Sequence, residues 1–170
     1  MQYLRTILLA TVLMFGFAAT TAAQSADEEP PAELPAFSFF KVHSGGFGAN
    51  PVFSNNDLPS GKATVVMLFD PYCDHCQQQT EEFTQAAGKL KNIHFVYVTT
   101  ESAEAASEFE SKYLKNSGLS YTLLRDKNYQ FDSIFSYSPV PSVYLYSANG
   151  RLLKYYKTDK APVDELVGAL

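Results

Sequence analysis

Two cysteines with two residues between them are the part of this sequence whose types and spacing could do chemistry. Cys73 and Cys76 are the only cysteines in the chain, and they lie in the hexapeptide Pro71-Tyr72-Cys73-Asp74-His75-Cys76. One turn of helix brings such a pair close enough to form and break a disulfide bond. A helix start also lowers the cost of holding Cys73 as a thiolate. The pattern therefore predicts thiol–disulfide exchange.

The two sulfurs are expected to have different roles. Cys73 would be the nucleophile, because the unpaired N–H groups of the first helical turn face it. Cys76, one turn deeper, would resolve a mixed disulfide with a substrate. A static structural disulfide is the alternative, but a three-residue step contributes little loop entropy. His75 could stabilise the thiolate or be a solvated helix residue, while the Asp74 carboxylate disfavours the thiolate. Whether the two residues together favour or disfavour the Cys73 thiolate stays open.

The segments around the cysteine pair indicate an α/β fold. Residues 64–69 form an apolar run without alternation, as expected for a central strand covered on both faces, and a helix with Phe83 and Leu90 inward follows over 74–90. Further strands are expected at 37–42, 52–53, 93–99, 121–124, 142–146 and 151–156, and further helices at 101–116, 128–135 and 163–169. This order predicts a mixed sheet with helices on both faces.

Composition and the N-terminus limit the classes of function. The chain has 170 residues, 46% of them hydrophobic, and a net charge of −5 without a long basic run, so nucleic acid is not an expected partner. Residues 1–23 are expected to be a cleavable signal peptide, with Arg5, a short apolar run and the small residues Thr21-Ala22-Ala23. A membrane anchor is the alternative, for which the run is short. We expect an exported protein, periplasmic or otherwise extracytoplasmic in a bacterium, with no membrane span after cleavage.

The remaining sequence divides into a leader and one domain. Residues 24–36 are acidic and contain three prolines, which predicts a flexible leader, and residues 37–170 are expected to form the domain. Residues 43–50 contain three glycines and are expected to form a loop or hairpin tip.

Three features together resemble the thioredoxin superfamily, and within it the extracytoplasmic redoxins of the TlpA/ResA type. The first is Cys73-Asp74-His75-Cys76 between an apolar strand and a helix; the second is the segment 138–146 followed by Asn149-Gly150-Arg151; the third is Leu58-Pro59-Ser60-Gly61-Lys62 before the first core strand. The resemblance covers roughly residues 37 to 170. It implies a thioredoxin fold with an N-terminal strand or hairpin extension.

The resemblance also implies roles for residues outside the cysteine pair. Pro141 should be cis and face the cysteines, and Val140 should offer backbone groups to an extended substrate segment. Tyr72 stands where thioredoxin has Trp, and the disulfide-oxidase branch of the family also has His and Val at the places of His75 and Val140. No cofactor is implied. The implied partners are thiol- or disulfide-bearing proteins and a redox partner that the sequence does not name.

One departure from thioredoxin concerns proton transfer. Thioredoxin carries a buried acid six residues before its first cysteine, and this chain has Met67 there. Protons must therefore move to and from Cys76 through another group or water, and Asp70, Glu101 and Glu104 are unranked candidates. The departure argues against efficient reductase activity.

Three other functions stay open. A copper-binding or metallochaperone module would use the cysteines and His75, completed by His43 or His94. A peroxidase of the peroxiredoxin class would need Thr where Asp70 stands. A redox-inert binding domain would fit the loss of the buried acid. Within the favoured function, reduction, oxidation and isomerisation of disulfides are all open, because the direction depends on the reduction potential and the electron partner.

Overall fold

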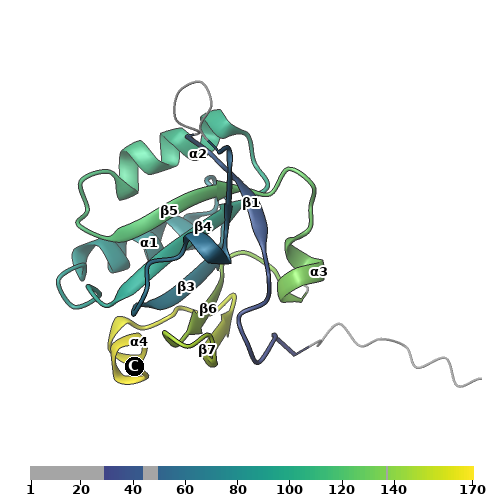
Figure 1. The fold of residues 1–170 in the computed structure, drawn as a ribbon. Helices are drawn as coiled ribbons and strands as arrows, with labels where there is room; N and C mark the ends of the chain where they lie inside the picture. Colours follow the sequence, from purple (N-terminus) through teal and green to yellow (C-terminus); the bar gives the residue numbers. More distant parts are fainter. Residues whose placement is uncertain (1–28, 44–49, 137) are drawn as a thin grey trace, which may run out of the picture.

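The computed structural model describes residues 29–43, 50–136 and 138–170, so the predicted signal peptide and the glycine-rich segment 44–49 lie outside the described residues. One seven-stranded sheet has the order β2-β1-β5-β4-β3-β6-β7 (Figure 1). The strands are β1 (Ser38–Lys41), β2 (Val52–Ser54), β3 (Ala63–Leu68), β4 (Ile93–Thr99), β5 (Ser120–Arg125), β6 (Ser142–Tyr146) and β7 (Leu152–Lys157). The helical segments are η1 (Asn55–Asp57), α1 (Asp74–Gln85), α2 (Ala103–Phe109), η2 (Glu110–Leu114), α3 (Phe131–Phe135) and α4 (Val163–Gly168).

The centre of the sheet is covered on both faces, as the unalternating apolar runs predict. Every residue of β3 and β4 is buried. The strands β3, β4 and β5 are parallel, and β6 runs antiparallel to β3 with Leu68 opposite Ser142. The carboxyl end of β3 and the amino end of β6 therefore meet at one edge of the sheet, and this edge carries the segments with the cysteine pair and the proline motif.

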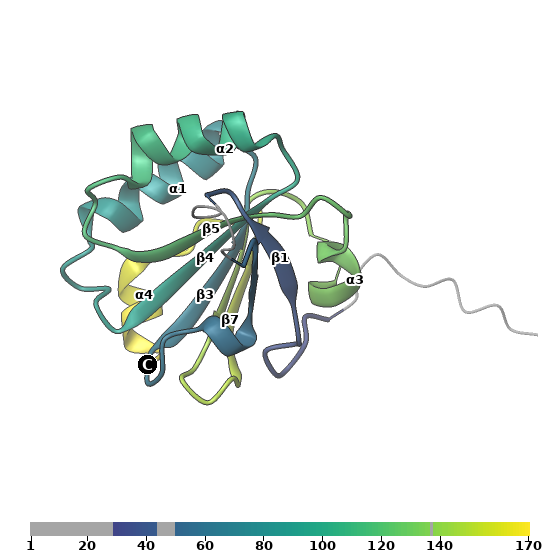
Figure 2. The same cartoon turned by 45° about the horizontal axis from the view of Figure 1, so that its top comes forward.

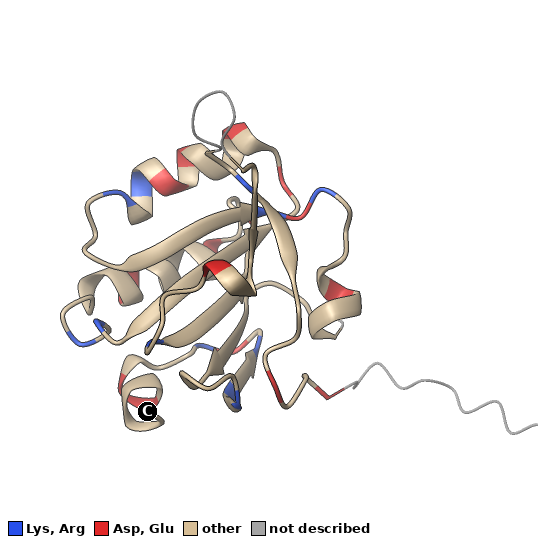
Figure 3. Ribbon diagram, viewed as in Figure 1, with Lys and Arg blue, Asp and Glu red and all other residues tan. Residues whose placement is uncertain are grey.

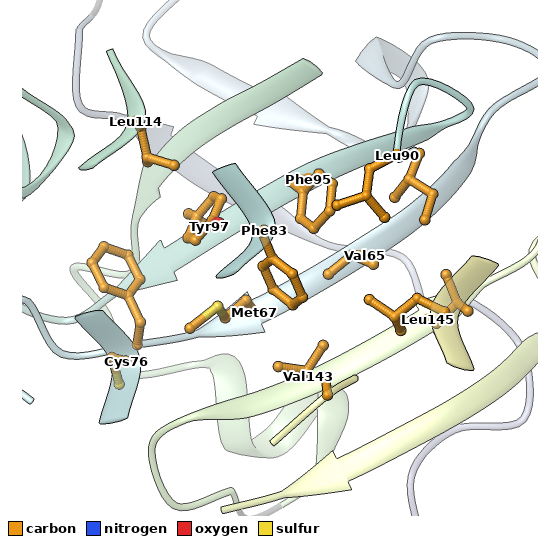
Figure 4. Packing of buried hydrophobic residues seen from close by; sticks show 14 of the residues in the cluster. Val65, Met67, Cys76, Phe83, Leu90, Phe95, Tyr97, Leu114, Val143 and Leu145 are labelled. Atoms are coloured by element: carbon orange, nitrogen blue, oxygen red, sulfur yellow. The ribbon is translucent and has the colours of Figure 1, made fainter. Parts of the chain in front are cut away.

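Two hydrophobic cores lie on the two faces of the sheet. On one face α1, α2 and α4 pack against the sheet and contribute Phe83, Phe109 and Leu166 to the larger core (Figures 1 and 2). On the other face α3 and the β1–β2 hairpin supply the smaller core, which contains Phe39 and Phe131. Figure 4 shows Cys76 among the side chains of the larger core.

The largest differences from the sequence prediction are in three helices. The helix predicted to reach residue 90 ends at Gln85, and tight turns such as Lys89 N–H to Ala86 O carry the chain to buried Leu90. The single helix predicted over 101–116 is α2 followed by one π-helical turn, closed by the bond from Lys115 N–H to Glu110 O. The last predicted short helix before the proline motif begins at Phe131 rather than 128.

The described part of the segment before β1 pairs with the β6–β7 hairpin. Leu34 N–H donates to Gly150 O at 2.6 Å, and Leu152 N–H donates to Ala32 O at 2.8 Å. Gly150 adopts a φ of 86°, the left-handed conformation that the Asn149-Gly150 turn requires. The division into leader and domain stays a prediction. In the residues that the structure describes, no helix has the length and apolar character needed to cross a membrane.

Candidate active site

The loop between β3 and α1 sets the position of Cys73. Asp70 folds this loop with two hydrogen bonds: its carbonyl accepts from Cys73 N–H at 3.1 Å, and its Oδ1 accepts from Tyr72 N–H at 2.8 Å. Cys73 is the N-cap residue of α1, with extended φ and ψ of −80° and 117°. The sequence prediction of a cysteine at a helix start is therefore met by the geometry.

The two thiols are both free and differ in access to solvent. Cys73 is partly exposed, whereas Cys76 has no exposed surface. The N–H of Cys76 donates to Cys73 Sγ at 3.4 Å, which is the capping bond of α1. This bond and the positive end of the helix both favour negative charge on the Cys73 sulfur. A substrate can therefore reach only the first sulfur of the pair.

The environment of Cys76 keeps its proton in place. Burial is the main cause that raises the pKa of the Cys76 thiol, and the nearby Cys73 sulfur and the charge of Asp70 raise it further. The backbone amide of Asp70 acts against these effects. Cys76 is thus a protonated thiol at neutral pH, and it needs a proton acceptor before it can attack a disulfide.

The proline motif lies at the same edge of the sheet. The peptide bond between Val140 and Pro141 is cis, as the resemblance implies. Pro141 is buried and directly precedes Ser142, which pairs with Leu68 at the end of β3. Val140 is 37% exposed. The strand register therefore brings the Val140–Pro141 step to the edge from which the cysteine loop starts.

The other predicted site residues lie on the surface beside this step. Tyr72 is 68% exposed, and His75 and Asp74 are exposed in the first turn of α1. Together with Val140, Tyr72 is one of the few large apolar side chains that the described residues expose. A surface with these side chains around a reactive sulfur suits contact with another protein.

The three candidate proton acceptors differ in their electrostatic effect on Cys76. Asp70 is near enough for its charge to act on the Cys76 thiol. Glu104 is fully exposed in the first turn of α2, where its pKa is lowered by hydrogen bonds from its own backbone amide and from Ser102. Neither Glu104 nor Glu101 is among the charges that shift the pKa of Cys76. Of the three acids, Asp70 is the one whose charge acts on the Cys76 thiol.

Met67 fills the place of the missing acid with apolar contacts. It is fully buried, pairs with Tyr97 across β4 and belongs to the same core as Cys76 (Figure 4). The Tyr97 hydroxyl is buried without a hydrogen-bond partner in the described part of the chain. Burial raises the pKa of Tyr97, and the Thr80 hydroxyl opposes this effect, although Thr80 donates its own hydrogen bond to Cys76 O at 2.8 Å.

The sequence analysis did not identify two linked side-chain hydrogen bonds that hold the cysteine loop. Gln77 Nε2 donates to Pro71 O at 2.8 Å, and Tyr113 Oη donates to Gln77 Oε1 at 2.7 Å. These bonds tie the residue pair before Cys73 to α1 and to η2. The only signal in the sequence is the place of Gln77 one residue after the motif, and this place alone does not identify its partners.

The two remaining histidines lie away from the cysteines in separate contacts. His94 is buried, with its ring nitrogens 2.9 Å from Ser120 Oγ and 3.0 Å from Thr122 Oγ1. Burial, with a smaller effect of Lys62, lowers its pKa to about 4. His43 Nε2 lies 2.6 Å from Glu110 Oε2, within hydrogen-bond distance. Among the described residues, no three His, Cys, Asp or Glu side chains are grouped so as to hold a metal ion.

Residues 33–155 match the sequence model of the AhpC/TSA family. The chain belongs to the AhpC/TSA family. Within this family of redoxins, the chain is similar to the soluble secreted antigen MPT53 of Mycobacterium tuberculosis and Mycobacterium bovis. The identity is 28% over 145 residues, which are 85% of this chain and 75% of MPT53.

Solved structures show the same fold. A secreted Mycobacterium tuberculosis disulfide oxidoreductase homologous to E. coli DsbE is 25% identical, with a TM-score of 0.61 over 78% of this chain and 92% of the other. MTB dsbF is 23% identical, with a TM-score of 0.63 over 82% and 96% of the two chains. A DsbE from Chlorobium tepidum, described as a thiol:disulfide interchange protein, is 18% identical, with a TM-score of 0.59 over 81% and 90%. The predicted thioredoxin-like α/β redoxin, related to secreted disulfide oxidoreductases, is confirmed.

Proposed function

We propose that this protein is a thiol–disulfide oxidoreductase that exchanges disulfides with other proteins outside the cytoplasm. The observation that carries the proposal is the unequal access of two free thiols one helical turn apart: Cys73 caps α1 and reaches solvent, whereas Cys76 is fully buried. The named activities of the similar mycobacterial proteins support the same class. Their secretion, together with the predicted signal peptide, supports an extracytoplasmic location.

The reaction divides into two displacements. The Cys73 thiolate attacks one sulfur of a substrate disulfide, the S–S bond breaks, and the other substrate sulfur leaves as a thiolate. Cys76 then loses its proton and attacks the Cys73 sulfur of the mixed disulfide, which releases the second substrate sulfur. Two electrons pass from the protein dithiol to the substrate, and the Cys73–Cys76 disulfide forms. The same steps in reverse oxidise a substrate dithiol.

Asp70 would accept the proton of Cys76 in the second step. Its charge already acts on the Cys76 thiol, and its side chain is half-buried at the end of β3. The bond from Tyr72 N–H to Oδ1 holds the carboxylate in place. This role replaces the acid that Met67 has displaced, and it selects one of the three carboxylates named from the sequence.

Three residues would contact or tune the reacting sulfur. Val140, exposed before the cis peptide bond, would offer its backbone groups to an extended substrate segment, and Tyr72 would cover part of that segment. His75, exposed in the turn that follows Cys73, would stabilise the reduced form through its imidazole. These assignments place the substrate across the edge where β3 ends and β6 begins.

Serine variants test the proposal. Cys76→Ser should accumulate a mixed disulfide with a disulfide-containing protein substrate such as insulin. The adduct is visible as a mass increase that dithiothreitol removes. Cys73→Ser should neither accumulate that adduct nor reduce insulin. Full exchange activity in Cys73→Ser would refute the assignment of the nucleophile, and full activity in the double variant would refute the proposed function.

A further inference from the structure

A cavity beside the reactive loop is the feature that the proposed function does not yet use. It measures about 270 Å³ and lies where the carboxyl ends of β3, β4 and β5 meet the segment before β6. Val140 and Asp70 belong to its wall, so it is continuous with the site where the substrate would dock. Such crevices at the carboxyl ends of parallel strands are common ligand sites in α/β proteins.

The lining has an apolar floor and a rim with a large exposed ring. Leu68, Phe69 and Phe131 are buried and form apolar walls. Tyr129, in the loop between β5 and α3, is 76% exposed and also lines the cavity, as does Val140 of the proline motif. The volume is below the range of about 300–1,000 Å³ that is usual for small-molecule pockets, and it suits one long side chain of a docked protein.

The polar part of the lining is acidic. Asp70, Asp126 and Asp132 all line the cavity, and no Lys, Arg or His does. Their hydrogen bonds come from neutral backbone donors: Tyr72 N–H to Asp70, Phe131 N–H to buried Asp126 at 2.8 Å, and Ser138 N–H to Asp132 at 3.3 Å. In the described ranges, none of the three carboxylates forms a salt bridge.

The basic side chains nearest in the sequence to these acids contact other groups. Lys127, between Asp126 and Tyr129 in the sequence, lies over the ring of Phe40 at 4.4 Å, and Arg125 donates to the carbonyl of Glu101. Figure 3 shows Lys and Arg as well as Asp and Glu along the ribbon, whereas the charged residues that line the cavity are all acids. The lining therefore has negative charges without a positive partner, and a ligand with a positive charge could supply that partner.

We infer that this cavity receives a basic side chain, Lys or Arg, that flanks the reacting cysteine of a protein substrate. The inference rests on the proposed function and names its substrate class. The aliphatic stem of the side chain packs on the apolar walls and its charged head reaches the carboxylates, a division that long basic side chains commonly make. The ring of Tyr129 offers a face to the cation. The cavity thus selects substrates by charge next to the sulfur.

Disulfide-linked peptide dimers test this inference on the full-length reduced protein. Each peptide has one central cysteine, and a Lys, Gln or Glu is moved through the positions on either side. The measured quantity is the second-order rate constant for appearance of the free peptide thiol in a single turnover, followed by chromatography. We expect one position at which Lys is preferred over Gln by about fivefold and Glu is the poorest, the size of a single partly exposed charge pair, with the preference falling as salt is added.

Two variants separate charge selection from general damage. Asp132→Asn, which keeps the shape of the exposed carboxylate, should bring the Lys-to-Gln ratio close to one. Glu108→Gln removes one negative charge from the exposed side of α2, outside the cavity, and should leave the ratio unchanged. Equal rates for all three peptides at every position would overturn the inference while leaving the proposed function standing. No exchange with any peptide would overturn the proposed function itself.

Discussion

The buried imidazole of His94 predicts a loss of stability in mild acid. Its pKa is lowered to about 4 by burial, against the usual value near 6.5 in an unfolded chain. Between these values the unfolded state binds more protons than the folded state, so the free energy of unfolding falls as the pH falls. Linkage gives a loss of about 2 kcal/mol between roughly pH 7 and pH 5, and about 3 kcal/mol by pH 4.

Urea unfolding of the reduced protein at a series of pH values measures this loss. Substitution His94→Gln removes the titrating ring but keeps a polar group between Ser120 and Thr122, so its unfolding free energy should lose about 2 kcal/mol less than the wild type between pH 7 and pH 5. His43→Gln, at the exposed side-chain contact with Glu110, is the matched control and should retain the loss. Parallel curves for wild type and His94→Gln would refute the assignment of a buried neutral imidazole.

Three further predictions concern the reactive site and the core. Asp70→Asn should slow release of substrate from the mixed disulfide by about tenfold or more in single-turnover measurements at neutral pH, whereas Glu101→Gln should not; equal rates in both variants would exclude Asp70 as the proton acceptor. His75→Ala should lower the reduction potential by about 30 mV in equilibrium with glutathione, because the imidazole favours the reduced form, and an unchanged potential would remove His75 from the mechanism. Tyr97→Phe should raise the free energy of unfolding by about 1 kcal/mol, because it removes a buried hydroxyl without a partner in the described residues, and a less stable variant would show that this hydroxyl is satisfied.

The order of strands and helices could be predicted because local patterns determine it. Residues of β3 and β4 are mostly apolar, and every residue of both strands is buried. The end of α1 could not be predicted in the same way. Leu90 continues the helical spacing of Phe83, but it reaches the core from a tight turn. The helical pattern of buried residues therefore continues beyond the last helical residue. The spacing reports which side chains are buried, and it does not report the backbone that carries them.

The site could be predicted only as far as short-range spacing reaches. Cys73 at a helix start and Cys76 one turn later follow from four consecutive residues and an adjacent strand. The bond from Tyr113 to Gln77 depends on how segments far apart in the sequence pack together. The acidic cavity depends on the same packing, since Asp70 follows β3, whereas Asp126 follows β5 and Asp132 lies in α3.

Competition between the two thiols for an alkylating reagent tests the central claim most directly. The reduced native protein would be treated briefly with iodoacetamide, unfolded, and treated with a second label of different mass, so that mass spectrometry reports the reaction of each cysteine in the folded state. The exposed helix-capping position predicts that Cys73 carries the first label and Cys76 the second. First-label modification of Cys76 at a rate equal to or above that of Cys73 would contradict the assignment of nucleophile and resolving thiol.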